Sequence, residues 1–189
     1  MQSHPITLSL GALPRFAKVC PRCGNQYYEN SGCFRVNANG KRLDIRLITR
    51  CEHCKSIWNL GVDERIDRAA LSPADYLGYL ENSPLLALRH VFDAAFLARN
   101  RAVLDLDHMD VSLSGGCPPV NEACEVTITC AYPLPLPAGR IIANALGVSL
   151  SRVKRMQEDG QLSFSGDLRK SKVGYGFCFT LQEGWQIGN

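Results

Sequence analysis

The stretch Cys20-Pro21-Arg22-Cys23 and its counterpart Cys51-Glu52-His53-Cys54 decide the fold of the amino-terminal part of this chain. Each Cys-x-x-Cys pair forms a tight turn that points two thiolates inward, and two such pairs supply the ligands of a closed tetrathiolate site. We therefore interpret Cys20, Cys23, Cys51 and Cys54 as ligands of a structural Zn²⁺ ion. The residues between the pairs leave room for a hairpin, which predicts a zinc ribbon.

The segment between the cysteine pairs has the pattern of that hairpin. Residues 33–37 and 43–48 are expected to be strands, and Asn39-Gly40 predicts a type I′ turn because both central residues of this turn need positive φ. Basic side chains on the hairpin either position the phosphates of a nucleic acid or serve as ordinary edge-strand charge. These residues are Arg35, Lys41, Arg42 and Arg46.

Composition and charge limit the function classes. The chain has 189 residues, nine cysteines and a net charge of +3. It lacks a signal-peptide pattern and an apolar run of about 18 residues, so we expect a cytoplasmic protein with no membrane partner and with five free thiols beside the four ligands. Basic residues predominate in 1–60 and 138–189 and acidic residues in 61–137, so either the two ends contact phosphate or the zones neutralise one another.

The run SGCFRVNANGKRLD from Ser31 to Asp44, together with Cys51, Cys54, Trp58 and Asn59, resembles the bacterial family of unknown function DUF1062. The resemblance implies a bacterial cytosolic protein and supplies no mechanism. Family members often have an aromatic residue where this chain has Arg46, a departure that affects only the hairpin surface.

Residues 63–137 are predicted to form a middle region of helices and strands. Ser72-Pro73 and Ser83-Pro84 each predict a helix start, and the second helix is expected to continue to about Asn100. Within it, His90 is interpreted as a packing residue rather than a catalyst. Strands are expected at 111–113 and 125–132, and the alternating prolines of 133–137 predict a linker.

A small acidic cluster lies in the same middle region. It consists of Asp105, Asp107, His108 and Asp110. Such a group can bind a metal or act as a base, but its spacing matches no known ligand pattern and is more typical of a solvated connection. We assign it no role, and a pocket that brings Asp107 or His108 to a cysteine would be needed to support an enzyme.

Residues 138–189 are predicted to form a small α+β module. A helix closed by Gly147 is followed by a basic helix capped by Ser149, then by a strand between Gly160 and Gly166. This order resembles the RNA-binding domain named after small ribosomal protein four. The resemblance implies phosphate contacts by Arg140, Arg152, Lys154 and Arg155. Leu150, Gln157 and Ser165 depart from the family pattern, which implies weaker or altered binding.

Two alternatives remain for this module. The helix pair also fits a helix-turn-helix of a DNA-binding regulator. The apolar residues Val173, Tyr175, Phe177, Phe179 and Leu181 alternate on one strand face, a pattern that favours a core position over base stacking. The sequence as a whole predicts an α+β protein of three parts, 1–62, 63–137 and 138–189, that binds structured ribosomal or transfer RNA without catalysis.

Overall fold

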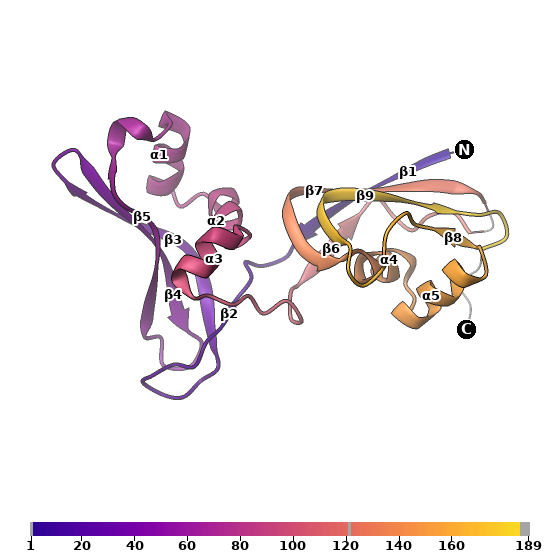
Figure 1. Ribbon diagram of the computed structural model, residues 1–189, viewed down its shortest axis with the longest axis horizontal. Helices are drawn as coiled ribbons and strands as arrows, with labels where there is room; N and C mark the ends of the chain where they lie inside the picture. The colour runs from indigo at the N-terminus through magenta and orange to yellow at the C-terminus, as the bar shows by residue number, and fades with distance from the viewer. Residues whose placement is uncertain (1, 121, 186–189) are drawn as a thin grey trace. The chain divides into compact units, whose positions relative to one another are not determined.

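The computed structural model describes residues 2–120 and 122–185, and the chain folds as two compact units (Figure 1). The cysteine unit is Ala12–Asp110, and the terminal unit combines Met1–Gly11 with Val111–Asn189. Each unit has its own sheet and helices, which confirms the predicted mixed α+β class. The division differs from the three expected parts, because the boundary at 62/63 falls inside a strand and the boundary at 137/138 lies within the terminal unit.

The cysteine unit is built on a four-stranded antiparallel sheet. Its strand order is β2 (Phe16–Ala17), β3 (Tyr27–Asn39), β4 (Arg42–Cys51) and β5 (Ile57–Asp67). A 3₁₀ turn, Arg68–Ala70, then leads to the helices α1 (Pro73–Leu80), α2 (Pro84–Val91) and α3 (Ala94–Asn100). Leu43, Ile45 and Leu47 of β4 are buried as their alternation predicts, so one face of the sheet forms the core.

The β3–β4 hairpin turns one residue later than predicted. Asn39 pairs with Arg42, so Gly40 and Lys41 are the central residues of the turn. Gly40 has a φ of 61°, whereas Lys41 is not among the described residues with positive φ. Positive φ at the first central residue alone is typical of a type II′ turn, so the predicted type I′ turn at Asn39-Gly40 is wrong.

The helix starts are confirmed, but the long second helix is not. The side chains of Ser72 and Ser83 accept hydrogen bonds from the backbone of the first helical turns. The helix expected from Ser83 to Asn100 breaks at Asp93, whose side chain caps α3 by accepting from the Ala95 N–H. A cap of this kind satisfies backbone donors in the middle of the predicted helix and lets the chain change direction.

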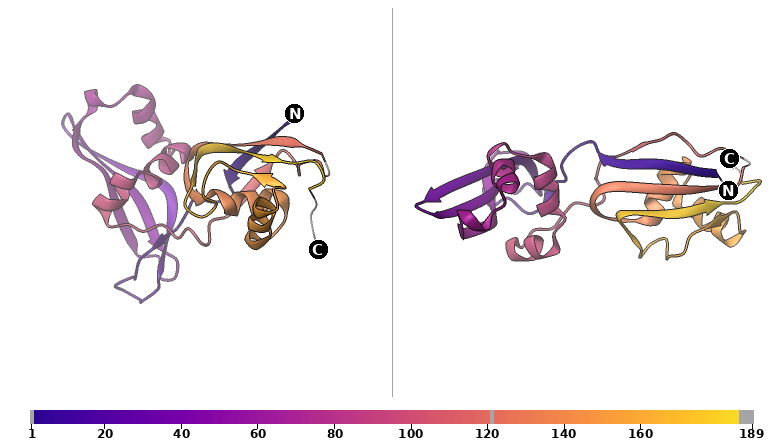
Figure 2. Two further views of the ribbon diagram at one scale, coloured as in Figure 1. Left: turned by 45° about the vertical axis from the view of Figure 1, so that its right-hand side comes forward. Right: turned by 90° about the horizontal axis from the view of Figure 1, so that it is seen from above.

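The terminal unit has a five-stranded mixed sheet with α4 and α5 on one face (Figure 2). The strand order is β6 (Val111–Ser114), β1 (Gln2–Leu10), β7 (Cys124–Pro137), β9 (Lys172–Leu181) and β8 (Leu162–Ser163). The helices are α4 (Ala138–Leu146) and α5 (Leu150–Glu158). β1, expected to lead into the first cysteine pair within one domain, instead pairs in parallel with β7 and antiparallel with β6.

The proline-rich segment is part of β7 and not a linker. Along residues 132–137 the side chains of Tyr132, Leu134 and Leu136 are buried, while the proline that follows each of them is half-buried. Alternation of this kind is that of a strand with one core face, and proline can occupy strand positions that donate no ladder hydrogen bond. The segment is therefore an extended strand inside the terminal unit, and the predicted linker is not found there.

Candidate metal centre

The first cysteine pair forms a knuckle closed by two backbone hydrogen bonds. The Cys20 N–H donates to the Asn25 carbonyl at 2.7 Å, and the Gly24 N–H donates to the Cys20 carbonyl at 2.9 Å. Gly24 has a φ of 75°, a conformation that glycine adopts without the steric cost of a Cβ. The closed turn points the side chains of Cys20 and Cys23 toward the same point.

The second pair repeats this backbone pattern. The Cys51 N–H donates to the Ser56 carbonyl at 2.9 Å, and the Lys55 N–H donates to the Cys51 carbonyl at 3.0 Å. Lys55 takes the left-handed position that Gly24 holds in the first knuckle, with a φ of 58°. Cys51 is the last residue of β4 and pairs with Tyr28 of β3, so the hairpin brings the second knuckle to the end of the sheet where the first one lies.

The four sulfur atoms converge at that end of the sheet. All four lie within 4.8 Å of one another, and Sγ–Sγ distances of 3.7 Å (Cys20 to Cys54) and 3.5 Å (Cys23 to Cys51) link the knuckles. Sulfurs held tetrahedrally at about 2.3 Å from Zn²⁺ lie about 3.8 Å apart, so the cluster has the dimensions of a tetrathiolate site. Among the described residues, no other group of three or more His, Cys, Asp or Glu side chains is placed to hold a metal ion.

Polar neighbours favour the thiolate form of Cys20 and Cys54. At Cys23, by contrast, a backbone hydrogen bond from Asn25 is outweighed by burial and by the other sulfurs, which raise the pKa of this thiol to about 11. The Ser56 hydroxyl lies 3.2 Å from the sulfurs of both Cys20 and Cys54. Hydrogen bonds from Ser56 and then Tyr28 lower the pKa of Cys20 to about 5, and the Ser56 hydrogen bond also lowers the pKa of Cys54. The Tyr28 ring packs edge-on against the ring of the half-buried Trp58, with the two ring centres 5.5 Å apart.

His53 lies inside the second Cys-x-x-Cys pair and has a side chain that can bind zinc, but it is exposed and does not belong to the cluster. The predicted ligand set of four cysteines is therefore brought together in full, and it could bind a metal ion.

An ion network that the sequence does not indicate surrounds Arg15, beside the second knuckle. Its Nε donates to Asp105 at 2.7 Å, its Nη1 donates to Glu52 at 3.1 Å, and its guanidinium lies 3.9 Å from the centre of the Tyr27 ring. His108 Nδ1 lies 2.9 Å from the same Asp105 carboxylate. Burial would raise the pKa of Asp105, but hydrogen bonds from His108 and Arg15 outweigh it and lower the pKa.

The acidic cluster therefore has a structural partner, Arg15, that lies 90 residues away in the chain. His108 also lines a pocket of about 510 Å³ together with Arg15 and Glu52. None of the described residues that line this pocket is a cysteine, so the constellation that would support an enzyme is not found there.

The basic residues of the hairpin lie on the sheet face opposite the buried one. Arg35 and Arg46 are direct cross-strand partners, and Lys41 and Arg42 lie at the turn. Like charges directly opposite one another destabilise a sheet unless an anion compensates them. Within the described ranges, none of these four cations makes a salt bridge to a carboxylate.

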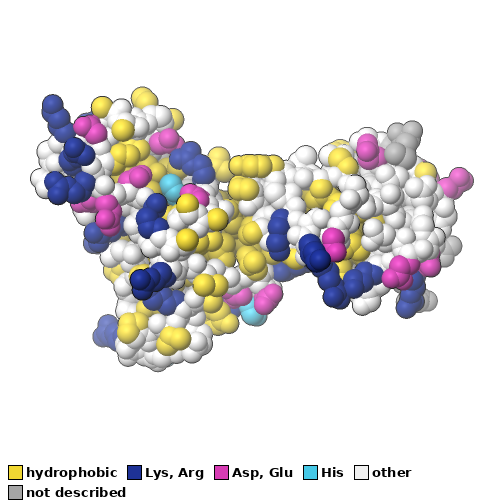
Figure 3. All heavy atoms as spheres, in the orientation of Figure 1, with side chains coloured by type: hydrophobic (Ala, Val, Ile, Leu, Met, Phe, Trp, Pro, Cys, Tyr) yellow, Lys and Arg dark blue, Asp and Glu magenta, His cyan; other side chains and the backbone are white. Residues whose placement is uncertain are grey.

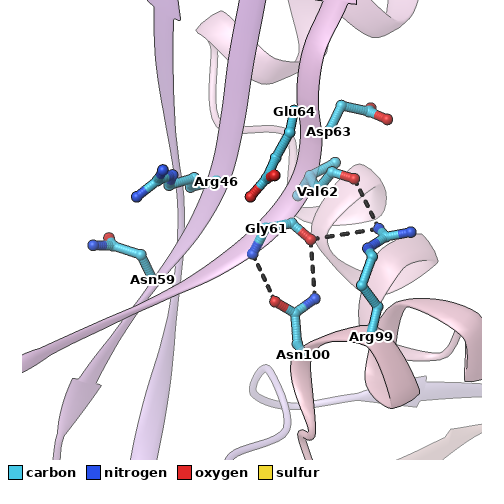
Figure 4. Close-up of a pocket in the computed structure, with 8 residues that line it drawn as sticks. All are labelled: Arg46, Asn59, Gly61, Val62, Asp63, Glu64, Arg99 and Asn100. Atoms are coloured by element: carbon cyan, nitrogen blue, oxygen red, sulfur yellow. Dashed lines mark hydrogen bonds between the residues drawn. The ribbon is translucent and has the colours of Figure 1, made fainter.

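Arg46 also reaches a polar pocket of about 400 Å³ at the edge of the sheet, shown in Figure 4. There the Asn100 side chain accepts from the Gly61 N–H at 2.7 Å and donates to the Gly61 carbonyl at 2.9 Å, as a neighbouring strand would. Arg99 donates to the Val62 carbonyl at 2.8 Å. These contacts satisfy the open edge of β5 and protect it from pairing with another chain.

The four basic residues predicted on the helix pair are unequally accessible. Arg140, on α4, is half-buried, and most of that helix is buried. Arg152 is half-buried with its Nε shielded from solvent, Lys154 is half-buried, and Arg155 is exposed. Ser149 caps α5 and Gly147 closes α4 with a φ of 64°, so the local geometry of the helix pair is confirmed.

A second element that the sequence prediction missed adds cations to this surface. The Leu168 carbonyl of the turn Asp167–Lys170 accepts the Gly139 N–H of α4 at 2.9 Å, and Arg169 of this turn lines a surface pocket of about 460 Å³ together with Lys154 of α5. Asp167 accepts the N–H groups of Arg169 and Lys170, and these hydrogen bonds lower its pKa. Figure 3 shows Lys and Arg side chains gathered on the side of the terminal unit where α4 and α5 lie.

Comparison with known proteins identifies the family. Residues 36–167 match the family model described as Protein of unknown function (DUF1062), and this match spans more than half of the chain. The chain belongs to this family. The prediction from the hairpin residues is thus confirmed, and the matched segment includes Cys51 and Cys54 and begins after Cys20 and Cys23.

No curated protein and no solved structure matches this DUF1062 member significantly. The resemblance of residues 138–189 to an RNA-binding domain receives no support from the comparisons and stays a prediction. No helix in the described part of the chain combines the length and the apolar character needed to cross a bilayer.

His90 of the DUF1062 protein belongs to the core rather than to a site. Its Nε2 lies 2.8 Å from the Tyr79 hydroxyl, and its ring contacts the rings of Phe34 and Phe96. Burial, followed by the nearby positive charge of Arg89, lowers its pKa.

We expect this histidine to make stability depend on pH. Because the pKa of His90 is lower in the folded state than its unfolded value of about 6.5, stability is highest above that value and falls as the pH drops below it. Urea unfolding with excess zinc at about pH 7.5 and about pH 5.5 measures the loss. The variant His90→Gln should lose less stability over this interval, and an equal loss in both proteins would contradict the assignment.

Proposed function

We propose that this protein binds structured RNA without catalysing a reaction, and that its four-cysteine centre holds Zn²⁺ as the core of a zinc ribbon. Zn²⁺ fits four thiolates at these distances better than the hard cations, which prefer oxygen ligands. With Cys20, Cys23, Cys51 and Cys54 as ligands, no coordination position is left for a substrate. The ion would supply folding energy and no chemistry.

The observation that carries the RNA proposal is a set of cations that form no salt bridges. Five Lys and Arg side chains on α5, on the turn 167–170 and at the start of β9 make no salt bridge to a carboxylate within residues 2–120 and 122–185, and two of them line the pocket beside α5. The five are Lys154, Arg155, Arg169, Lys170 and Lys172. Cations without salt bridges remain available to phosphates, even though Glu158 and Asp167 also line the pocket, and phosphate contacts supply most of the affinity of a nucleic-acid-binding protein.

The Arg35–Arg46 pair of the cysteine unit supports the same proposal independently. Two opposed guanidinium groups on an open sheet face are relieved when a phosphate lies between them. Lys41 and Arg42 extend this positive surface to the end of the hairpin. The two surfaces belong to different units, so each is expected to contribute its own phosphate contacts.

The packing of α5 favours RNA over a helix-turn-helix reading of DNA. A recognition helix presents its first residues to the bases of the major groove. Here Leu150 at the start of α5 lies against Gly139 of α4, and Val153 is fully buried. The cations lie farther along the helix and on the next turn, where they suit phosphates better than base edges.

A competition experiment tests the proposal. Labelled transfer or ribosomal RNA bound to the full-length protein is challenged with unlabelled folded RNA or with duplex DNA of the same phosphate concentration. We expect folded RNA to displace the label at a concentration at least about tenfold lower than DNA. Stronger displacement by DNA would assign the protein to the DNA-binding regulators instead, and absence of salt-sensitive binding would exclude both.

A further inference from the structure

Tyr175 does not take the core position that the alternation of β9 predicts. The side chains of Val173, Phe179 and Leu181 are at most 2% exposed, whereas that of Tyr175 is 66% exposed. This is the largest exposed fraction among the large hydrophobic side chains of the described residues. The Tyr175 hydroxyl has no hydrogen-bond partner among the described residues.

The backbone around Tyr175 explains this exposure. Gly174 and Gly176 have φ angles of 57° and 147°, so the regular pleat of β9 is interrupted on both sides of the tyrosine. A Cβ at Gly176 would lie 2.2 Å from the Ile128 carbonyl oxygen, so only glycine fits there. The two glycines therefore hold the Tyr175 ring at the surface instead of in the core.

The partner strand deviates at the same place. Thr129 of β7 pairs with Gly176 and Leu134 pairs with Gly174, so four residues of β7 lie opposite Tyr175 alone. Irregularities of this kind re-aim a side chain, and they are over-represented beside functional sites. An aromatic ring held outward at an irregular point of a sheet is a platform for a flat ligand.

The charges that precede Tyr175 indicate the chemistry of that ligand. Arg169, Lys170 and Lys172 lie within six residues of it and are exposed. None of the three makes a salt bridge with a described carboxylate, and Arg169 lines the pocket beside α5. Proteins bind unpaired nucleotides by combining a stacking ring with cations that follow the phosphate backbone, and residues 169–175 supply both on exposed side chains.

We propose that Tyr175 stacks against an unpaired base of the RNA whose phosphates are bound by Arg169, Lys170 and Lys172. This inference rests on the proposed RNA-binding function and specifies that part of the bound RNA is single-stranded. Stacking is possible with every base, because each has a π-face, so the contact selects for unpaired nucleotides and not for a sequence.

The test compares Tyr175 variants on two RNA probes. The full-length protein and its variants Tyr175→Ala and Tyr175→Phe are titrated with an unstructured oligouridine of about 12 nucleotides and with duplex RNA of the same length. We expect Tyr175→Ala to weaken oligouridine binding about 5- to 150-fold and Tyr175→Phe to retain it, because phenylalanine keeps the ring. The salt dependence of binding stays unchanged, since no charge is removed.

Val120→Ala serves as the matched control, because Val120 is 43% exposed in the same unit and should not affect binding. Duplex binding should be equal in all four proteins. Photocrosslinking of 4-thiouridine placed in the oligouridine is expected to modify the peptide that contains Tyr175. Equal oligouridine affinity of Tyr175→Ala and wild type would overturn this inference alone, whereas a wild-type protein that binds neither probe would refute the RNA proposal itself.

Discussion

Removal of the metal is expected to unfold the Ala12–Asp110 unit, and Cys51→Ser is expected to do the same at any metal concentration. Cys51 is fully buried at the end of β4, and its sulfur lies 3.5 Å from that of Cys23. Structural zinc sites contribute about 10–16 kcal/mol of apparent binding free energy in small domains, which is comparable to the total stability of about 5–15 kcal/mol of a typical domain. Without the ion, no metal–sulfur bonds would join the two knuckles, and four ionisable thiols would remain close together.

Hydrogen exchange followed by mass spectrometry locates this effect. After treatment with a chelator, peptides from β3 and β4 should lose their protection, and added zinc should restore it. Elemental analysis should find one zinc ion per chain in the untreated protein. Cys33→Ser is the matched control, because Cys33 is an exposed cysteine of the same unit outside the cluster. Retained protection in the metal-free protein would show that the centre is not structural.

Charge reversal on the surface beside α5 is expected to have the largest effect on RNA binding. The triple variant Lys154→Glu, Arg155→Glu, Arg169→Glu removes three cations that lack carboxylate partners among the described residues. Each lost phosphate contact should reduce the slope of log affinity against log salt by about 0.7 to 0.9. At about 0.1 M salt, three contacts correspond to a loss of affinity of roughly 100-fold or more. Arg152 is left unchanged because its shielded Nε indicates a role in packing.

A control variant with the same net charge separates specific contacts from general attraction. Lys55, Arg68 and Arg89 are exposed cations that already contact Glu29, Tyr76 and Asp75. Reversal of these three charges should reduce the RNA affinity much less, because the cations already contact groups within the fold. The variant should also stay folded, because surface ion pairs contribute little to stability. Filter binding over a range of salt concentrations measures both variants. Equal losses in the two triple variants would mean that the protein attracts RNA only through its net charge.

Local features of this protein were predictable because short-range chemistry decides them. The cysteine knuckles, the helix caps at Ser72, Ser83 and Ser149, and the helix end at Gly147 each depend on contacts within a few residues. The turn at Gly40 was predicted one residue early because the choice between type I′ and type II′ depends on strand register, which the whole hairpin sets.

Features that depend on distant segments were not predictable from one sequence. The salt bridge from Arg15 to Asp105 joins residues 90 positions apart, so the acidic cluster alone could not reveal its partner. The same holds for the turn at Asp167–Lys170, whose cations join those of α5 only through packing. Leu and Pro alternation in residues 132–137 indicated an extended chain, but only pairing with β9 makes it a strand.

The sequence by itself determined the set of four cysteines that could bind a metal ion, the family and the presence of a basic hairpin and a basic helix, because residue type and spacing specify these features. Only the tertiary structure decided that β1 joins β7 across more than a hundred residues, that the two units are divided at Ala12 and Asp110, and that Tyr175 is exposed. Parallel pairing and strand irregularities depend on which distant backbone groups meet, and no local pattern encodes that choice.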